Sequence, residues 1–283
     1  MFNNKLLFLI ILIILLIFLL KSKKESFTNN NRFKLVVTTF NPGKYLEKCL
    51  ESIERQKYKN YDVCVIDDAS TKDINYMREI IFDYCKRNNW KYSFQKKNVG
   101  PLKSRINAIN KLKCKDDDIL IFIDGDDMLS SSNVLTILNK YYQEDIYVTF
   151  GSFLIKTKNN IKKEKYIYCD ENIIRKIKNK KVRNINDTWY FSHLKTMKYY
   201  IYKNIDHEKY LKHNGKYFTS ATDIALMNPA VELANPKIKF IPEVLYYYTQ
   251  DHPESFHNKK NNTQKTNQRI INSLQSAKSL FNK

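Results

Sequence analysis

The alternation of strand-like and helix-like segments is the feature that most limits how this chain can fold. Between residues 34 and 123, short apolar runs rich in β-branched residues alternate with segments whose apolar residues recur at helical spacing. The strand-like runs are residues 34–40, 61–70, 91–95 and 119–123, and the helix-like segments are residues 42–56, 77–85 and 101–112. This order predicts βαβ units with right-handed crossovers, and hence an α/β fold with a mostly parallel central sheet and flanking helices.

The second half of the chain is less regular. Its pattern predicts strands over residues 146–155, 165–168 and 238–248, and helices over residues 171–178, 193–202 and 222–233. Apolar residues recur at helical spacing from residue 263 onward. This spacing predicts a terminal helix that packs on the body of the protein.

Polar side chains follow three of the predicted parallel strands, and they occur in pairs: Thr39 with Asn41, Asp67 with Asp68, and Asp124 with Asp126. Ligands of such sheets bind outside the carboxyl ends of the strands, so we expect these pairs to share one crevice. Crowded carboxylates need a compensating charge, and oxygen ligands suit Mg²⁺ or Mn²⁺ bound to a nucleotide diphosphate. Taken alone, Asp-Gly-Asp is also an ordinary turn.

Net charge narrows the partners only weakly. The formal charge of +20 would suit nucleic acid, anionic lipid or a phosphorylated substrate. Abundant Asn, Lys, Ile and Tyr with only 5 Gly resemble the usage of an AT-rich genome, which raises the Lys count without selection for binding. A nucleic-acid partner also leaves the acidic crevice unexplained, so none is expected. The five cysteines show no metal-ligand spacing, which argues against zinc.

Residues 6–20 form an uninterrupted apolar run flanked by Lys5 and Lys21. As a helix the run covers about 22 Å of a hydrocarbon core of about 30 Å, and flanking lysines can close that gap. No small-residue cleavage site follows it. The sequence therefore predicts a membrane anchor at residues 1–24, a linker at residues 25–32, and a single-pass protein whose catalytic domain faces the cytoplasm.

Three segments carry a family resemblance. "VVTTFNPGKYLEKCLESIERQKYKNYDVCVIDDAS", "KNVGPLKSRINAI" and "IFIDGDD" occur in this order. They resemble the donor half of GT-A fold, family 2 glycosyltransferases over residues 34–129, and residues 189–257 are more faintly similar to the acceptor half. The resemblance implies a GT-A domain at residues 33–255, with a nucleotide-sugar half at 33–129 and an acceptor half at 130–255. A helical tail would follow at residues 256–283.

The same resemblance implies roles for single residues. It places a nucleotide sugar against Thr39, Asn41, Asp67 or Asp68, Gly100, Arg105 and Asp124. Asp126 would hold Mn²⁺ or Mg²⁺. His193, His252 and His257 could complete the metal shell or position the sugar, and His252 is the one chosen as a candidate ligand. Two alternatives remain open, since one of the paired aspartates can serve only as a helix cap and Arg105 can lie on a solvated helix face.

Asp223 is the candidate catalytic base. It opens the predicted helix in "SATDIALM", where the family usually carries Glu-Asp and this chain has Thr222-Asp223. An acidic residue that only interacts with the helix dipole is the alternative. The chain lacks a QxxRW element, which argues against a processive polysaccharide synthase.

The predicted function is therefore a metal-dependent, inverting, non-processive glycosyltransferase. It would move a sugar from a nucleotide sugar, a UDP-sugar in the first instance, to a glycan, protein or lipid acceptor. Three alternatives remain: a nucleotidyltransferase, a catalytically degenerate protein that binds nucleotide sugars, and a basic protein that binds membranes or nucleic acid.

Overall fold

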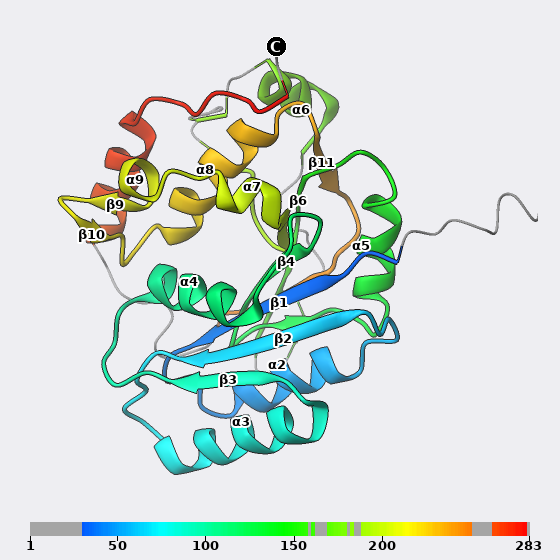
Figure 1. Ribbon diagram of the computed structural model, residues 1–283, viewed down its shortest axis with the longest axis vertical. Coiled ribbons are helices and arrows are strands. Elements are labelled where there is room, and N and C mark those ends of the chain that lie inside the picture. The colour runs from blue at the N-terminus through cyan, green and yellow to red at the C-terminus, as the bar shows by residue number, and fades with distance from the viewer. Residues whose placement is uncertain are drawn as a thin grey trace, which may run out of the picture. The chain divides into compact units, whose positions relative to one another are not determined.

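A seven-stranded sheet forms the centre of the protein (Figure 1). The computed structural model describes residues 30–157, 160–161, 169–179, 182–183, 188–250 and 262–281. The strand order is β11 (Ile238–Ile241), β6 (Val148–Gly151), β8 (Lys195–Lys198), β4 (Ile119–Asp124), β1 (Phe33–Thr39), β2 (Tyr61–Asp67) and β3 (Lys91–Phe94). Only β8 runs antiparallel to its neighbours, so the predicted α/β fold with a mostly parallel sheet is confirmed.

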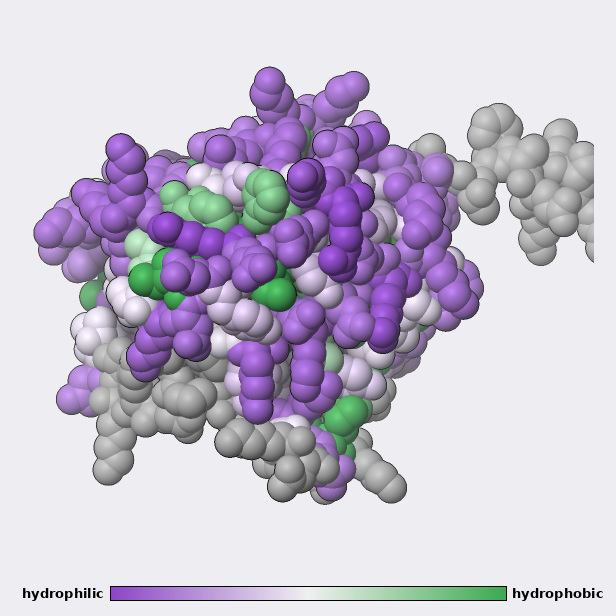
Figure 2. Space-filling model, turned by 90° about the horizontal axis from the view of Figure 1, so that it is seen from below, coloured by the Kyte–Doolittle hydropathy of each residue, from purple (hydrophilic) through white to green (hydrophobic). Residues whose placement is uncertain are grey.

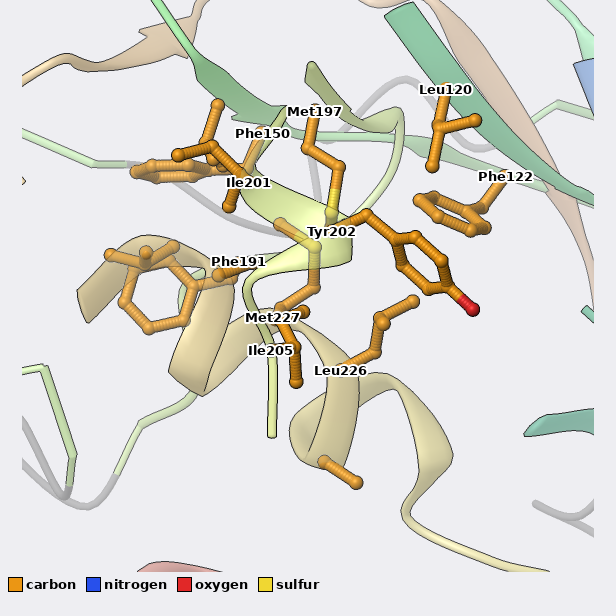
Figure 3. Close-up of a cluster of buried hydrophobic side chains, with 14 of the residues drawn as sticks. Leu120, Phe122, Phe150, Phe191, Met197, Ile201, Tyr202, Ile205, Leu226 and Met227 are labelled. Carbon is orange, nitrogen blue, oxygen red and sulfur yellow. The ribbon is translucent and has the colours of Figure 1, made fainter. Parts of the chain in front are cut away.

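Helices cover both faces of this sheet because the strands alternate their apolar side chains. In β1, Leu35 and Val37 pack toward α2 (Tyr45–Glu54), α3 (Ile74–Asn88) and α5 (Val134–Tyr141). Val36 points to the opposite face, toward α4 (Pro101–Leu112) and α8 (Thr222–Ala234). Figure 3 shows this second layer, where Phe122 lies in one buried cluster with Leu226 and with Tyr202 of α7 (Tyr199–Lys203).

Smaller elements complete the fold. β5 (Met128–Leu129), β12 (Tyr246–Thr249) and β7 (Leu154–Lys156) form a three-stranded sheet in the order β5-β12-β7. β9 (Lys212–His213) and β10 (Lys216–Tyr217) form a hairpin after the π-helical turn η1 (His207–Leu211). The helix α6 (Glu171–Lys178) has the predicted bounds. The predicted terminal helix is α9 (Asn262–Ser273), whose Ile271 is buried in the main core.

Three predicted elements of the second half need correction. The strand expected over residues 146–155 is β6 and β7, which belong to two different sheets. The strand expected over residues 238–248 is two strands in two different sheets, because Pro242 has no N–H group with which to continue the ladder. The helix expected over residues 193–202 begins as β8, which inserts between β4 and β6 and satisfies the backbone groups of both. The strand expected over residues 165–168 lies outside the described residues.

The predicted single-pass membrane localisation is also corrected. Across the part of the chain that the structure describes, no helix is both long enough and apolar enough to cross a bilayer. The predicted membrane partner and cytoplasmic orientation lose their support with it. Residues 1–24, the expected anchor, lie outside the described residues.

The face shown in Figure 2 is largely hydrophilic, with small and separate hydrophobic patches. Among the described residues, the large hydrophobic side chains with more than a third of their surface exposed are Phe40, Ile74, Tyr76, Phe82 and Leu280. Phe40 differs from the others in its position, because it directly follows β1 at the edge of the sheet where the polar pairs end.

Candidate functional site

The polar ends of β1, β2 and β4 meet at one edge of the sheet, as the strand-end rule predicts. Thr39 pairs in register with Asp67, and Thr38 with Asp124. The chain after β4 turns back against β1, since the Gly125 N–H donates to the Thr38 carbonyl over 2.8 Å. A Cβ atom at Gly125 would lie 2.6 Å from the Thr39 Cβ atom, so a larger residue there would force this loop away from β1.

Asn41 and Asp67 join the loops that follow β1 and β2. The Asn41 backbone adopts a left-handed conformation with φ 50°, which asparagine tolerates better than most residues. Its Oδ1 accepts hydrogen bonds from the Thr71 N–H over 2.7 Å and the Lys72 N–H over 3.0 Å. Asp67 accepts from the Ser70 N–H over 3.2 Å and from the Ser70 hydroxyl. These bonds therefore tie the loop after β1 to the loop after β2.

Asp68 holds the start of α4. Its two carboxylate oxygens accept from the Val99 N–H over 2.9 Å and from the Gly100 N–H over 2.8 Å. Burial raises the pKa of Asp68 above its ordinary value. Gly100 has φ 86° and lies against Thr219, so both its conformation and its surroundings favour glycine. Asp68 thus holds the loop before α4, but neither of the paired aspartates caps a helix, because the N-cap residues of α3 and α4 are Asp73 and Gly100 and neither helix has a side-chain cap.

Phe40 is a candidate that the sequence analysis missed. Its ring is 40% exposed between Thr39 and Asn41, two residues whose side chains belong to the same strand end. An aromatic residue between two polar residues at the carboxyl end of a parallel strand is the signal that points to it, because such a ring offers a face for stacking beside the crevice.

Arg105 connects the two halves of the site. This guanidinium is 4% exposed on α4, and its Nη2 donates to Asp124 Oδ1 over 2.8 Å. Its Nη1 donates to Asp223 Oδ1 over 2.6 Å, so it does not lie on a solvated helix face. A second cation, Lys195 of β8, donates to Asp223 Oδ2 over 2.7 Å and is 1% exposed. Lys195 was missed because its segment was expected to form a helix.

These contacts separate the carboxyl groups by charge state. Burial opposes the ionisation of Asp223, but Lys195 and Arg105 outweigh it and hold its pKa well below the usual range. Burial and the charge of Asp124 raise the pKa of Asp126 to about 7. Burial, Asp126 and Asp124 raise the pKa of Asp127 well above its ordinary value. Asp223 and Asp124 are thus ionised beside buried cations. Negative charge on Asp126 and Asp127 is disfavoured unless positive charge is added.

Asp124, Asp127 and His193 can hold a metal ion. Each offers one ligand atom, and these atoms lie within 4.8 Å of one another. Asp127 Oδ1 accepts from the Thr249 N–H over 2.7 Å, whereas Asp127 Oδ2 and His193 Nδ1 are buried with no hydrogen-bond partner in the described structure. Burial and Lys195 lower the pKa of His193 to about 3, so the imidazole is neutral. Carboxylate oxygens beside a neutral imidazole fit Mn²⁺ or Mg²⁺.

The predicted metal ligands stand differently. Asp126 adjoins this cluster in the chain but is not one of the three residues whose ligand atoms converge. His252 lies outside the described residues. Asp127 was not predicted as a ligand, although "DGDD" already contains it as a third carboxylate. His193 was one of three candidate histidines, of which His252 rather than His193 was chosen.

The three-stranded sheet holds two members of this cluster, Asp124 and His193, in place through Tyr246 of β12. The Tyr246 hydroxyl accepts a hydrogen bond from the Asp124 N–H over 3.0 Å. The Tyr246 ring stacks on His193, with the ring centroids 4.5 Å apart and an angle of 8° between the planes. β12 therefore fixes both the end of β4 and the imidazole beside it.

A mostly parallel sheet with carboxylates and buried cations at its strand ends is typical of α/β proteins that bind their ligands at this edge of the sheet. Residues 34–206, more than half of the chain, match the sequence profile of Glycosyl transferase family 2. The chain belongs to this family.

Known proteins agree with this assignment. The protein named glycosyltransferase GlyA of Streptococcus pneumoniae is 29% identical over 121 residues, which are 42% of this chain and 16% of GlyA. This chain therefore matches less than a fifth of the length of that relative.

Two solved structures share the fold. Residues 1–349 of S. aureus TarS, in complex with UDP-GlcNAc, superpose with a TM-score of 0.60 and 22% identity, over 81% of this chain and 62% of that one. The mannosyltransferase PcManGT of Pyrobaculum calidifontis, in complex with GDP-Man and Mn²⁺, gives a TM-score of 0.54 and 14% identity, over 80% and 59%. At these identities the likeness establishes the GT-A fold.

Proposed function

We propose that the protein is a metal-dependent, inverting, non-processive glycosyltransferase that uses a nucleotide sugar, in the first instance a UDP-sugar. The observation that carries this proposal is the network in which Arg105 bridges Asp124 and Asp223 at the edge where β1, β2 and β4 end. The UDP-GlcNAc bound to TarS and the Mn²⁺ bound to PcManGT support it. The acceptor is a glycan, a protein or a lipid.

The nucleotide is proposed to lie over the ends of β1 and β2, in the half of the domain formed by residues 33–129. Thr39 and Asn41 line this pocket, and the exposed ring of Phe40 stacks on the base. Asp67 accepts a hydrogen bond from the base, since each of its oxygens keeps a lone pair beyond the bonds from Ser70. Gly100 has no side chain and lets the backbone come close to the nucleotide sugar. The half of the domain formed by residues 130–255 receives the acceptor.

The divalent cation is proposed to be held by Asp126 together with the cluster of Asp124, Asp127 and His193. When bound, it neutralises the diphosphate that leaves with the nucleotide. Asp124 also contacts the ribose, and Arg105 faces the diphosphate while its guanidinium keeps Asp124 and Asp223 in place. A guanidinium suits this position because its planar fork can donate to two groups at once.

Asp223 is proposed to accept the proton of the attacking hydroxyl. In a single inversion the acceptor oxygen bonds to the anomeric carbon as the bond to the diphosphate breaks, and the hydroxyl proton passes to a carboxylate. Lys195 and Arg105 keep Asp223 ionised and so able to accept that proton. The same cations make it a weak base, so the proton moves after the new C–O bond has largely formed and the hydroxyl has become acidic.

The deciding experiment is an assay of nucleotide release (UDP, GDP or CMP) from UDP-, GDP- and CMP-sugars, with Mn²⁺, with Mg²⁺ and with a chelator. We expect release that depends on the cation and is lost in Asp126→Ala, while the thermal unfolding profile stays cooperative. Full activity of that variant would refute the metal assignment. Release of pyrophosphate from a nucleoside triphosphate and a sugar 1-phosphate, tested separately, would instead identify a nucleotidyltransferase. Donor-induced thermal stabilisation without turnover would identify the degenerate alternative.

A further inference from the structure

A pocket of about 310 Å³ opens beside the loop that carries the carboxylates. It is lined by Lys44, Tyr45, Lys48, Met128, Lys156, Thr157 and Thr249. The walls thus come from the start of α2 and from all three strands of the small sheet or their ends. Its volume is at the lower end of the range of about 300–1,000 Å³ that is typical of small-molecule sites.

Three lysines give this pocket its chemistry. Lys44 and Lys48 are exposed at the start of α2, and Lys156 is half-buried in β7 with its Nζ 3.2 Å from the Met128 sulfur. Within the described part of the chain, none of the three forms an ion pair with a carboxylate. Burial and the charge of Lys48 lower the pKa of Lys156.

A buried hydroxyl gives a second, independent sign of a ligand. Thr249 is 3% exposed and lines the pocket, yet its Oγ1 has no hydrogen-bond partner among the residues described. Unpaired buried polar atoms are costly and therefore rare. The Thr249 N–H donates to Asp127, so the pocket begins one residue from the proposed metal cluster. A pocket lined by three lysines and an unpaired hydroxyl suits an anion with several oxygen atoms.

We propose that this lysine pocket binds a phosphate group carried by the acceptor, so that the substrate of the transferase is a phosphate-bearing glycan or polyol. That the phosphate belongs to an acceptor rests on the proposed function, whereas the phosphate site itself does not. The donor is the other possible source of a phosphate. Its diphosphate already faces Arg105 and the metal cluster, and the lysines are supplied by α2 and the small sheet rather than by β2 or α4.

The test measures binding of sn-glycerol 3-phosphate by calorimetry, alone and in the presence of saturating UDP and Mn²⁺, with glycerol as the neutral probe. We expect the phosphate compound to bind in both conditions and glycerol to bind in neither. The double substitution Lys48→Gln/Lys156→Gln is expected to weaken binding at least tenfold, since it removes two charge-assisted contacts. The affinity for UDP should stay within about twofold of wild type, because neither lysine lies at the nucleotide site.

A second double substitution, which removes the same amount of positive charge outside the pocket, serves as the control. Lys86 and Lys178 are exposed on α3 and α6, and Lys86→Gln/Lys178→Gln should leave glycerol 3-phosphate binding unchanged. Lys48→Gln alone retains the half-buried Lys156 and guards against a folding defect. Competition between UDP and glycerol 3-phosphate would overturn the proposal, because the pocket would then serve the donor. Unchanged binding in the double variant would overturn it too. Phosphate binding without nucleotide release from any donor would instead refute the proposed function alone.

Discussion

Asp126→Asn is expected to stabilise the protein at pH 8 while removing its response to divalent cations. Burial and Asp124 raise the pKa of this carboxyl from 3.8 to about 7. At about 1.4 kcal/mol per pKa unit, ionising Asp126 in the folded protein costs at most about 4 kcal/mol. Asp126 is partly exposed, and solvent screening reduces this cost to about 1–2 kcal/mol. For a domain of this size, the variant should melt roughly 2–8 °C higher.

The sign of the pH dependence follows from proton linkage. Because the folded pKa of Asp126 is raised, the folded state keeps a proton that the unfolded state releases above pH 4. The free energy of unfolding therefore falls as the pH rises from about 4 to about 7 and is constant above that range. Asparagine carries no such proton. The advantage of the variant should be complete at pH 8 and should nearly vanish near pH 4.

The measurement is the melting temperature of wild type and variant in chelator, at pH 4.5 and pH 8, followed by Mn²⁺ with UDP at pH 8. The ligands should raise the melting temperature of wild type and leave that of the variant unchanged. Asp83→Asn, which removes an exposed carboxylate on α3, should change neither quantity. A variant that melts below wild type at pH 8, or that still responds to Mn²⁺ and UDP, would refute the reasoning.

Three further substitutions probe the rest of the site. Phe40→Ala should raise KM for the donor about tenfold with kcat unchanged, since base stacking contributes roughly 1–3 kcal/mol. Phe82→Ala, which removes a similarly exposed ring on α3, should leave KM unchanged, and equal KM values for the two variants would exclude stacking. Arg105→Met should lower the free energy of unfolding, measured by urea denaturation, by about 3 kcal/mol, because it removes the buried cation that pairs with Asp124 and Asp223. A loss below about 1 kcal/mol would contradict the view that Arg105 compensates these two carboxylates. Asp223→Asn should reduce transfer by about 10²–10⁴ and preserve stabilisation by UDP with Mn²⁺; near-normal transfer would exclude Asp223 as the base.

The first half of the fold could be predicted because its signals are local. β1, β2 and β4 are largely apolar runs of six or seven residues, β3 is a short stretch of alternating polar and aromatic residues, and the helices between them carry apolar residues at helical spacing. Parallel order then follows from the length of the connections, and one rule about strand ends places Thr39, Asp67 and Asp124 together. Nothing about the remote chain is needed for these steps.

The second half could not be predicted in the same way because its strands are defined by distant partners. β8 reads as a helix until β4 and β6 are placed on either side of it, and Lys195 and His193 are then carried into the site. Likewise, Asp127 accepts from the Thr249 N–H across 122 positions of the chain, a pairing that no local pattern encodes. Local propensity is weak evidence where tertiary contacts decide the backbone conformation.

The charge state of Asp223 shows what this division means for function. Its position in the sequence, at the start of a helix, suggests only a carboxylate that is stabilised by a helix dipole. In the folded protein, α4 supplies Arg105 and β8 supplies Lys195, and the two cations reach different oxygens of the same carboxylate. The local residues thus specify where the proposed base stands, whereas the ionised state in which it can accept a proton is secured only when two remote elements close around it.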